Sequence, residues 1–138
     1  GINIKYVQEN EPKGTAGAIK ACEHLLDDYF LLINGDTIYD INYHDLSLNF
    51  LDGSIGNIAL NYVENVSRYG EVKTEASKVV SFKEKSGNKG GYINSGVCVL
   101  SRKITECISS YPSSLEKEIF PNLMKKNLLT ARKYKSFF

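Results

Sequence analysis

A short, wholly apolar run that ends in a polar turn constrains the fold of this chain more than any other feature of its sequence. The run is Tyr29–Ile33, and the turn that follows it has the sequence NGDT at residues 34–37. Consecutive apolar residues bounded by turn residues are typical of a strand that is buried on both faces of a parallel sheet. We therefore predict that this strand lies inside an α/β sheet, with Asp36 just beyond its carboxyl end.

The residues before this strand predict the other two parts of a strand–helix–strand unit. Residues 1–7 alternate apolar and polar side chains as a strand does, and residues 15–26 repeat apolar side chains at helical spacing, with Thr15 placed to cap the helix. Such a unit predicts a right-handed crossover and an α/β domain. Because ligands of these sheets gather beyond the carboxyl ends of the strands, we expect loops 8–14 and 34–37 to lie on the same rim.

The rest of the sequence predicts further strands and helices. Gly96 interrupts one of the strands, which indicates a close approach of backbone or of a ligand at that point. We expect helices at residues 45–51, 102–109 and 114–126, and strands at residues 57–63, 68–73, 79–85, 92–100 and 128–133.

Composition excludes some classes of partner. The formal net charge is +1, so the sequence offers no overall electrostatic attraction for nucleic acid. Its apolar runs are too short to span a membrane, and we expect no membrane partner. The 3 cysteines have no C-x-x-C spacing, which favours a reduced, cytoplasmic protein whose cysteines fill space in the core.

Taken one at a time, the polar motifs leave more than one interpretation open. Asp36 could hold a Mg²⁺ ion that bridges phosphates, or it could stabilise its own turn. The Lys13-Gly14-Thr15 segment resembles a phosphate cradle before a helix, yet it is not a Walker A sequence. Residues 82–85, with the sequence FKEK, could line a site or form a solvated strand edge.

The order and spacing of these motifs resemble the sugar-1-phosphate nucleotidyltransferase family over nearly the whole chain. The guanylyltransferases of mannose 1-phosphate and of D-glycero-α-D-manno-heptose 1-phosphate are the most similar members. The resemblance rests on EPKGTAGAI (11–19), LLINGDT (31–37), RYGEV (68–72), FKEK (82–85), INSGV (93–97) and SLEKEIFP (114–121).

This resemblance implies a fold, a reaction and a set of site residues. The fold would be a GT-A-like α/β fold, with a Rossmann-like mixed sheet flanked by helices. The reaction would transfer a nucleoside monophosphate from a nucleoside triphosphate to a sugar 1-phosphate, which gives a nucleotide-sugar and pyrophosphate. Asp36 matches the Mg²⁺ ligand, and Lys85 matches the cation that faces the sugar phosphate. Sugar binding is implied for Gly70, Glu84, Asn94, Ser95 and Gly96.

The resemblance also implies how the base is recognised. Glu9 lies where the family reads the nucleobase, and Gly14 and Thr15 match the backbone that packs on the base. A carboxylate can accept hydrogen bonds from guanine N1–H and N2–H₂ together, which favours GTP. Gln8 would read a pyrimidine instead if the loop were shifted by one residue.

Two departures from the family pattern limit what we expect of this chain. The sequence lacks the Gly-rich G-G-x-G-T-R-L loop, and it lacks the late Asp-Ile-Gly segment that supplies a second metal ligand. We therefore expect residues 1–138 to be the central and C-terminal part of a single nucleotidyltransferase domain, incomplete at both ends and inactive by itself. Many relatives assemble, so a homo-oligomer is a further expectation.

Two other functions stay open at this stage. A metal-dependent glycosyltransferase would also hold a diphosphate through an aspartate-bound metal, but Asp36-Thr37-Ile38 lacks the Asp-x-Asp that such enzymes usually show. A non-catalytic module that binds nucleotide or sugar is the alternative from a different class.

Overall fold

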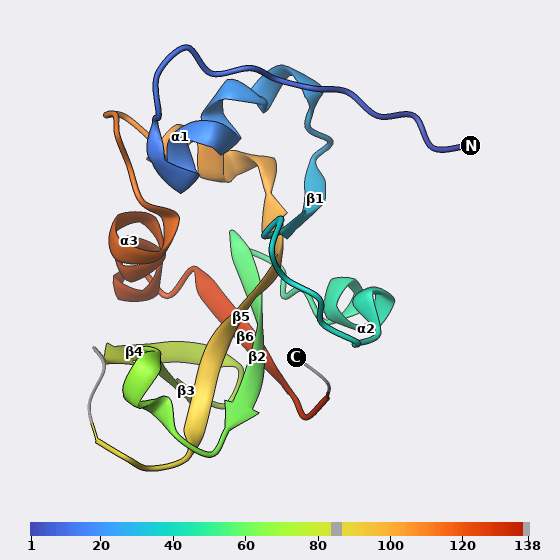
Figure 1. The fold of residues 1–138 in the computed structure, drawn as a ribbon. Coiled ribbons are helices and arrows are strands. Elements are labelled where there is room, and N and C mark those ends of the chain that lie inside the picture. Colours follow the sequence, from blue (N-terminus) through green and yellow to red (C-terminus); the bar gives the residue numbers. More distant parts are fainter. Residues whose placement is uncertain (84–86, 137–138) are drawn as a thin grey trace.

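The computed structural model describes residues 1–83 and 87–136, which form a mixed sheet flanked by helices (Figure 1). The six-stranded sheet in these residues has the strand order β1-β5-β2-β6-β4-β3. Its strands are β1 (Tyr29–Ile33), β2 (Gly56–Val63), β3 (Glu71–Glu75), β4 (Lys78–Lys83), β5 (Gly91–Ser101) and β6 (Leu129–Tyr134). Strands β2 and β6 run parallel, whereas β5 pairs antiparallel with β1, β2 and β3. The prediction of an α/β fold with a mixed sheet is confirmed.

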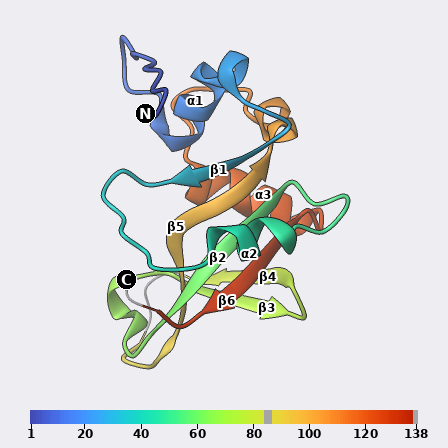
Figure 2. The same ribbon diagram turned by 90° about the vertical axis from the view of Figure 1, so that its right-hand side faces the viewer.

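The helices cover both faces of the sheet. The α-helices are α1 (Gly14–Ala21), α2 (Tyr43–Leu48) and α3 (Phe120–Lys125), and the short helical turns are η1 (Glu23–Leu25), η2 (Val66–Arg68), η3 (Arg102–Cys107) and η4 (Leu115–Ile119). Figures 1 and 2 place α2 on one face of the sheet and α1 and α3 on the other. None of the helices in the described residues is long and apolar enough to cross a membrane.

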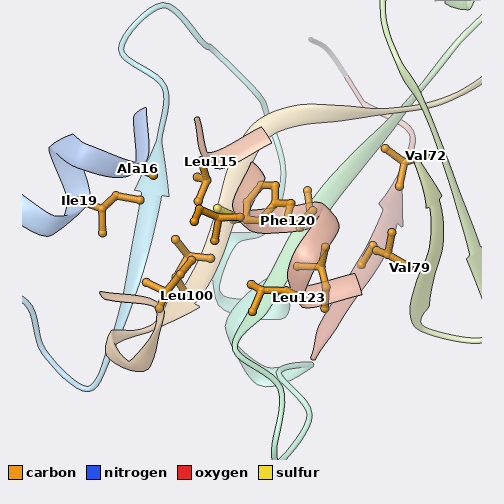
Figure 3. Close-up of a cluster of buried hydrophobic side chains, with 14 of the residues drawn as sticks. Ala16, Ile19, Val72, Val79, Leu100, Leu115, Phe120 and Leu123 are labelled. Atoms are coloured by element: carbon orange, nitrogen blue, oxygen red, sulfur yellow. The ribbon is translucent and has the colours of Figure 1, made fainter. Parts of the chain in front are cut away.

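Side-chain alternation along the central strands builds one core on each face. Ile58 and Leu60 of β2 point toward α1 and α3 and join the larger core, part of which is drawn in Figure 3. Ala59, between them, points the other way and packs with Leu46 of α2 and with Val97. Successive residues of a strand face opposite sides, so β2 is buried on both of its faces.

Two predictions about the beginning of the chain are wrong. Residues 1–7 form no strand, and they run past α1 (Figure 1), with residues 1–6 exposed. An alternating segment forms a strand only where another strand satisfies its backbone groups, and none of the described strands pairs with it. The predicted parallel crossover into β1 is therefore absent as well.

Strand β1 is present at its predicted residues but not in its predicted surroundings. It lies at the edge of the sheet and pairs antiparallel with β5. Phe30 and Leu32 pack against the larger core, whereas Tyr29, Leu31 and Ile33 are exposed. A continuous apolar run therefore indicated the strand correctly, but not the burial of both of its faces.

The other elements lie near their predicted residues, with local differences. The predicted helix 15–26 divides into α1 and η1. The N-cap residue of α1 is Lys13, not the predicted Thr15. The predicted helix 102–109 is a 3₁₀ helix, and the predicted helix 114–126 begins with the π-helical turn η4. The predicted helix 45–51 begins earlier, as α2, because the Asn42 side chain accepts a hydrogen bond from the Asp45 amide.

Candidate active site

The turn after β1 is held against β5 by a close approach at Gly96. The backbone N–H of Asn34 donates a hydrogen bond to the Gly96 carbonyl at 2.9 Å. Gly96 has a φ of +83°, and a Cβ atom there would lie 2.6 Å from Asn34 Nδ2 and 2.9 Å from Thr37 Oγ1. A larger residue would therefore have to displace the Asn34 and Thr37 side chains, and the predicted close approach at Gly96 is confirmed.

Asp36 lies on this turn with an exposed side chain. Within residues 1–83 and 87–136 its carboxylate has no hydrogen bond or ion pair, and no group of three or more His, Cys, Asp or Glu side chains is placed to hold a metal ion. Mg²⁺ is commonly held by one or two carboxylates, with phosphate oxygens and water as its other ligands. The oxygen donor and the open position of Asp36 therefore fit a Mg²⁺ ion that is shared with a phosphorylated ligand.

A cleft of about 640 Å³ opens beside this turn, between β5, the β3–β4 hairpin and the η4–α3 segment. It brings together residues from motifs that are far apart in the sequence. Three of the predicted site residues, Gly70, Asn94 and Gly96, line it. Asn34, the first residue of the turn that bears Asp36, lines it as well. This volume is in the range of small-molecule binding sites.

Charged residues that the sequence reasoning did not assign to the site also line this cleft. The cations are Arg68, Lys83 and Lys117, and the carboxylates are Glu71 and Glu116. Arg68 and Lys83 belong to recognised motifs, but the sequence alone did not show that the two residues line the same hollow. Three cations in one cleft indicate a site for an anionic ligand.

Three lysines lie around Glu71, a residue that lines the cleft. Glu71 is only 6% exposed, and its carboxylate lies 3.6 Å from Lys73 Nζ and 3.5 Å from Lys89 Nζ. Contact with Lys73 and the charge of Lys89 lower the pKa of Lys83, which pairs with Glu71 across the hairpin. One carboxylate therefore faces three ammonium groups, an arrangement that an added anion would stabilise.

The remaining predicted sugar-binding residues differ in what the structure describes. The Ser95 hydroxyl is buried and donates to the Ala59 carbonyl at 2.7 Å, so this side chain does not face the cleft. Glu84 and Lys85 lie outside the described residues. Lys83, at the end of β4, does line the cleft.

The predicted nucleotide-binding residues lie before and at the start of α1. Gln8 is exposed and Glu9 is half-buried, and Glu9 Oε1 is a buried oxygen without a hydrogen-bond partner in the described part of the chain. Gly14 packs against the backbone of Ser113, and the Thr15 hydroxyl donates to Glu116, which lines the cleft. The start of α1 and the turn 34–37 thus adjoin one cleft.

Comparisons with known proteins agree with this arrangement. The family described as Nucleotidyl transferase matches residues 1–135. A mannose-1-phosphate guanyltransferase of Gibberella zeae is 36% identical over 137 residues, which are 94% of this chain and 38% of that protein. A D-glycero-alpha-D-manno-heptose 1-phosphate guanylyltransferase of Campylobacter jejuni is 41% identical over 105 residues, which are 75% of this chain and 46% of that protein.

The similarity extends to a solved structure. The crystal structure of HddC from Yersinia pseudotuberculosis, complexed with GMP-PN, superposes with a TM-score of 0.80 at 36% identity, covering 94% of this chain and 57% of that chain. This chain thus spans less than half the length of the two curated relatives described above. With nearly all of its residues matched in sequence and in fold, the chain belongs to the nucleotidyl transferase family.

Proposed function

We propose that this chain forms the central and C-terminal part, residues 1–138, of a single domain that transfers GMP from GTP to a sugar 1-phosphate. The products would be a GDP-sugar and pyrophosphate, so the protein would act in nucleotide-sugar biosynthesis. Support comes from the family, from relatives named guanylyltransferases and from a similar structure that was solved with GMP-PN. Because the chain spans only part of these relatives, we assign turnover to the whole natural protein and expect none from this chain alone.

One observation carries the proposal. Asn34, Gly70 and Gly96 come from three separate motifs and line one cleft beside the exposed carboxylate of Asp36. A sugar phosphate needs hydrogen-bonding groups for its hydroxyls and positive charge for its phosphate. The cleft offers both kinds of residue, because Asn94 and the cations Arg68, Lys83 and Lys117 also line it.

The reaction forms a bond between a phosphate oxygen of the sugar 1-phosphate and the α-phosphorus of GTP. The bond from the α-phosphorus to the bridging oxygen of the β-phosphate breaks, and pyrophosphate leaves with that electron pair. The attacking phosphate is already an anion near neutral pH, so it needs no protein base. The chain's task is to align two polyanions and to offset their repulsion.

The size of that repulsion explains the charges in the cleft. Two unit charges about 4 Å apart repel by roughly 4 kcal/mol at an effective dielectric constant of about 20. Arg68, Lys83 and Lys117 would lower this cost by drawing the phosphates into the cleft. Mg²⁺ bound to Asp36 would supply further charge neutralisation and order the phosphates of the nucleotide.

The other predicted site residues keep their roles as proposals. Glu9 would read guanine, with Gln8 as its neighbour, and the backbone of Gly14 and Thr15 would pack on the base. An unpartnered buried carboxylate oxygen on Glu9 supports this, because such an oxygen is stabilised by gaining a donor. Gly70, Glu84, Lys85, Asn94 and Gly96 would bind the sugar phosphate, and Ser95 would contribute through its backbone alone because its hydroxyl is engaged.

Two further expectations concern the protein in the cell. We place it in the cytoplasm, since Cys22, Cys98 and Cys107 are free thiols that suit a reducing compartment. Assembly into a homo-oligomer stays a prediction, which light scattering on the purified protein can check.

Pyrophosphate release from GTP and mannose 1-phosphate, with Mg²⁺ present, tests the function in the natural full-length protein. We expect turnover with the wild type and a loss of roughly 100-fold or more with Asp36→Asn, because a bound metal contributes several kcal/mol to such reactions. Asp40→Asn, which changes an exposed carboxylate farther along the same loop, is the matched control and should keep full activity. Full activity of Asp36→Asn at saturating Mg²⁺ would disprove the metal-binding role.

A further inference from the structure

Two segments that are about a hundred residues apart in the sequence are joined beside the cleft. The Ala16 amide donates to the Ser113 carbonyl at 3.0 Å, and the Ser113 amide donates to the Lys13 carbonyl at 2.9 Å. Gly14, between them, has a φ of +78°, and a Cβ atom there would lie 2.3 Å from the Ser113 carbonyl oxygen. Figure 3 shows Ala16 and Leu115, which follow these contacts, in the same core. The start of α1 is thus fixed to the start of η4.

The Thr15 side chain extends this joint to a residue of the cleft. Its hydroxyl accepts a hydrogen bond from the Leu115 amide at 2.8 Å and donates to Glu116 Oε2 at 3.0 Å. The Ser114 hydroxyl lies 3.4 Å from the same Glu116 oxygen. The carboxylate of Glu116 is therefore held by one of its oxygens, and its other oxygen, Oε1, has no partner among the described residues.

Two neighbouring residues of the π-helical turn η4, Glu116 and Lys117, line the cleft. Glu118, the next residue, instead accepts a hydrogen bond from the Ser114 amide at 2.7 Å and does not line the cleft. Turns of this kind occur frequently at functional sites.

We propose that Glu116 accepts hydrogen bonds from hydroxyl groups of the bound sugar, and that Thr15 is the positioning residue that holds it there. The inference rests on the proposed function and assigns a sugar-recognition residue to the same cleft. A carboxylate repels phosphate groups, so a polyhydroxylated group is the part of the ligand that suits it. Because Thr15 follows the nucleotide-binding loop, the hydrogen bond also links the nucleotide site to the sugar site.

Calorimetry with mannose 1-phosphate, in the presence of a non-hydrolysable GTP analogue and Mg²⁺, tests this on the full-length protein. Glu116→Gln should weaken sugar-phosphate binding about 10-fold, as expected for losing a hydrogen bond to a charged group, with GTP-analogue binding unchanged. Glu118→Gln is the matched control from the same turn and should bind mannose 1-phosphate as the wild type does.

The positioning role of Thr15 has its own pair of variants. Thr15→Val removes the hydroxyl and should weaken sugar-phosphate binding by about 5-fold, whereas Thr15→Ser keeps the hydroxyl and should restore it. A thermal melt of each variant shows whether it is folded, and Thr15→Ser keeps the test informative if Thr15→Val is not.

The outcomes separate this inference from the proposed function. If the wild type binds neither mannose 1-phosphate nor D-glycero-α-D-manno-heptose 1-phosphate, both fall. If the wild type binds either sugar phosphate and Glu116→Gln binds it equally tightly, the inference alone falls. A loss of GTP-analogue binding that equals the loss of sugar-phosphate binding in Glu116→Gln would overturn it as well, because it would show a general structural role.

Discussion

Two glycines beside the cleft, Gly14 and Gly96, each allow close contact between segments that are distant in the sequence. The groups that they contact differ in kind. Both glycines have a positive φ, and both leave no room for a Cβ atom. At Gly14 the obstacle is the backbone of Ser113, whereas at Gly96 it is the side-chain ends of Asn34 and Thr37. The first joint places Thr15 and Glu116, and the second places the turn that bears Asp36.

This difference indicates how the site is assembled. Backbone contacts fix the position of each segment, and the functional side chains project from the fixed segments. A backbone obstacle cannot move without breaking the hydrogen bonds of Ser113, while a side-chain end can rotate. The Gly14 joint should therefore tolerate substitution less well than the Gly96 joint.

Gly14→Ala is expected to have the largest effect on stability. The positive φ and the contact with Ser113 together should cost about 3 kcal/mol or more of unfolding free energy. Urea denaturation of the purified variant measures this. Gly53→Ala is the matched control, because Gly53 also has a positive φ, of +83°, but nothing lies within 4 Å of the added Cβ atom. It should cost only about 1–2 kcal/mol, and an equal loss in the two variants would refute the packing role of Gly14.

Gly96→Ala should have an intermediate effect, about 2 kcal/mol, because the neighbouring side chains can yield. Adding Asn34→Ala removes the nearest obstacle and should recover part of the loss, which the same urea titration would detect. No comparable rescue is expected for Gly14→Ala with Ser113→Gly, since the obstacle there is main chain. A full rescue at Gly14, or none at Gly96, would reverse the comparison.

Removing a contact that is made by side chains alone should have the smallest effect on stability. Asp45 of α2 accepts hydrogen bonds from Tyr134 Oη at 2.7 Å and Arg132 Nε at 2.6 Å, both on β6. These bonds hold the pKa of Asp45 below its ordinary value of 3.8, and the bond from Tyr134 has the largest effect. The lowered pKa stabilises the folded state above pH 3.8, and this contribution is lost as the pH falls through the folded-state pKa.

Asp45→Asn should consequently lower stability slightly at pH 7 and less at a pH below the folded-state pKa, because an exposed ion pair contributes little. Urea titrations of both proteins across this pH range measure the difference. A gap between the two proteins that widens toward low pH would contradict the sign of the effect.

The sequence predicted the central part of the fold well and its edges less well. Strand β2 and strand β5 lie within a residue or so of their predicted ends, because their turn residues and apolar patterns agree. The predicted environment of β1 was wrong because an apolar run does not reveal how many neighbouring strands a strand has. The prediction of a strand at residues 1–7 was wrong because a strand needs a pairing partner, which the local sequence does not specify.

The site shows the same limit. Gly96 could be predicted as a close approach because a glycine inside a strand is itself a local signal. The contact of Thr15 with Glu116 could not be predicted, since it joins residues 101 positions apart through packing of the whole domain. The orientation of Ser95 away from the cleft depends likewise on the register shift between β2 and β5.

The cleft as the sugar-phosphate site is tested most directly by an NMR titration of the ¹⁵N-labelled protein with mannose 1-phosphate, a GTP analogue and Mg²⁺. We predict that the amide signals of Gly70 and Gly96 and the side-chain amide signals of Asn34 and Asn94 shift together, since all four residues line the cleft. Shifts confined to the separate hollow between β1 and α2, which Tyr29 and Phe50 line, would contradict the account, as would the absence of any shift.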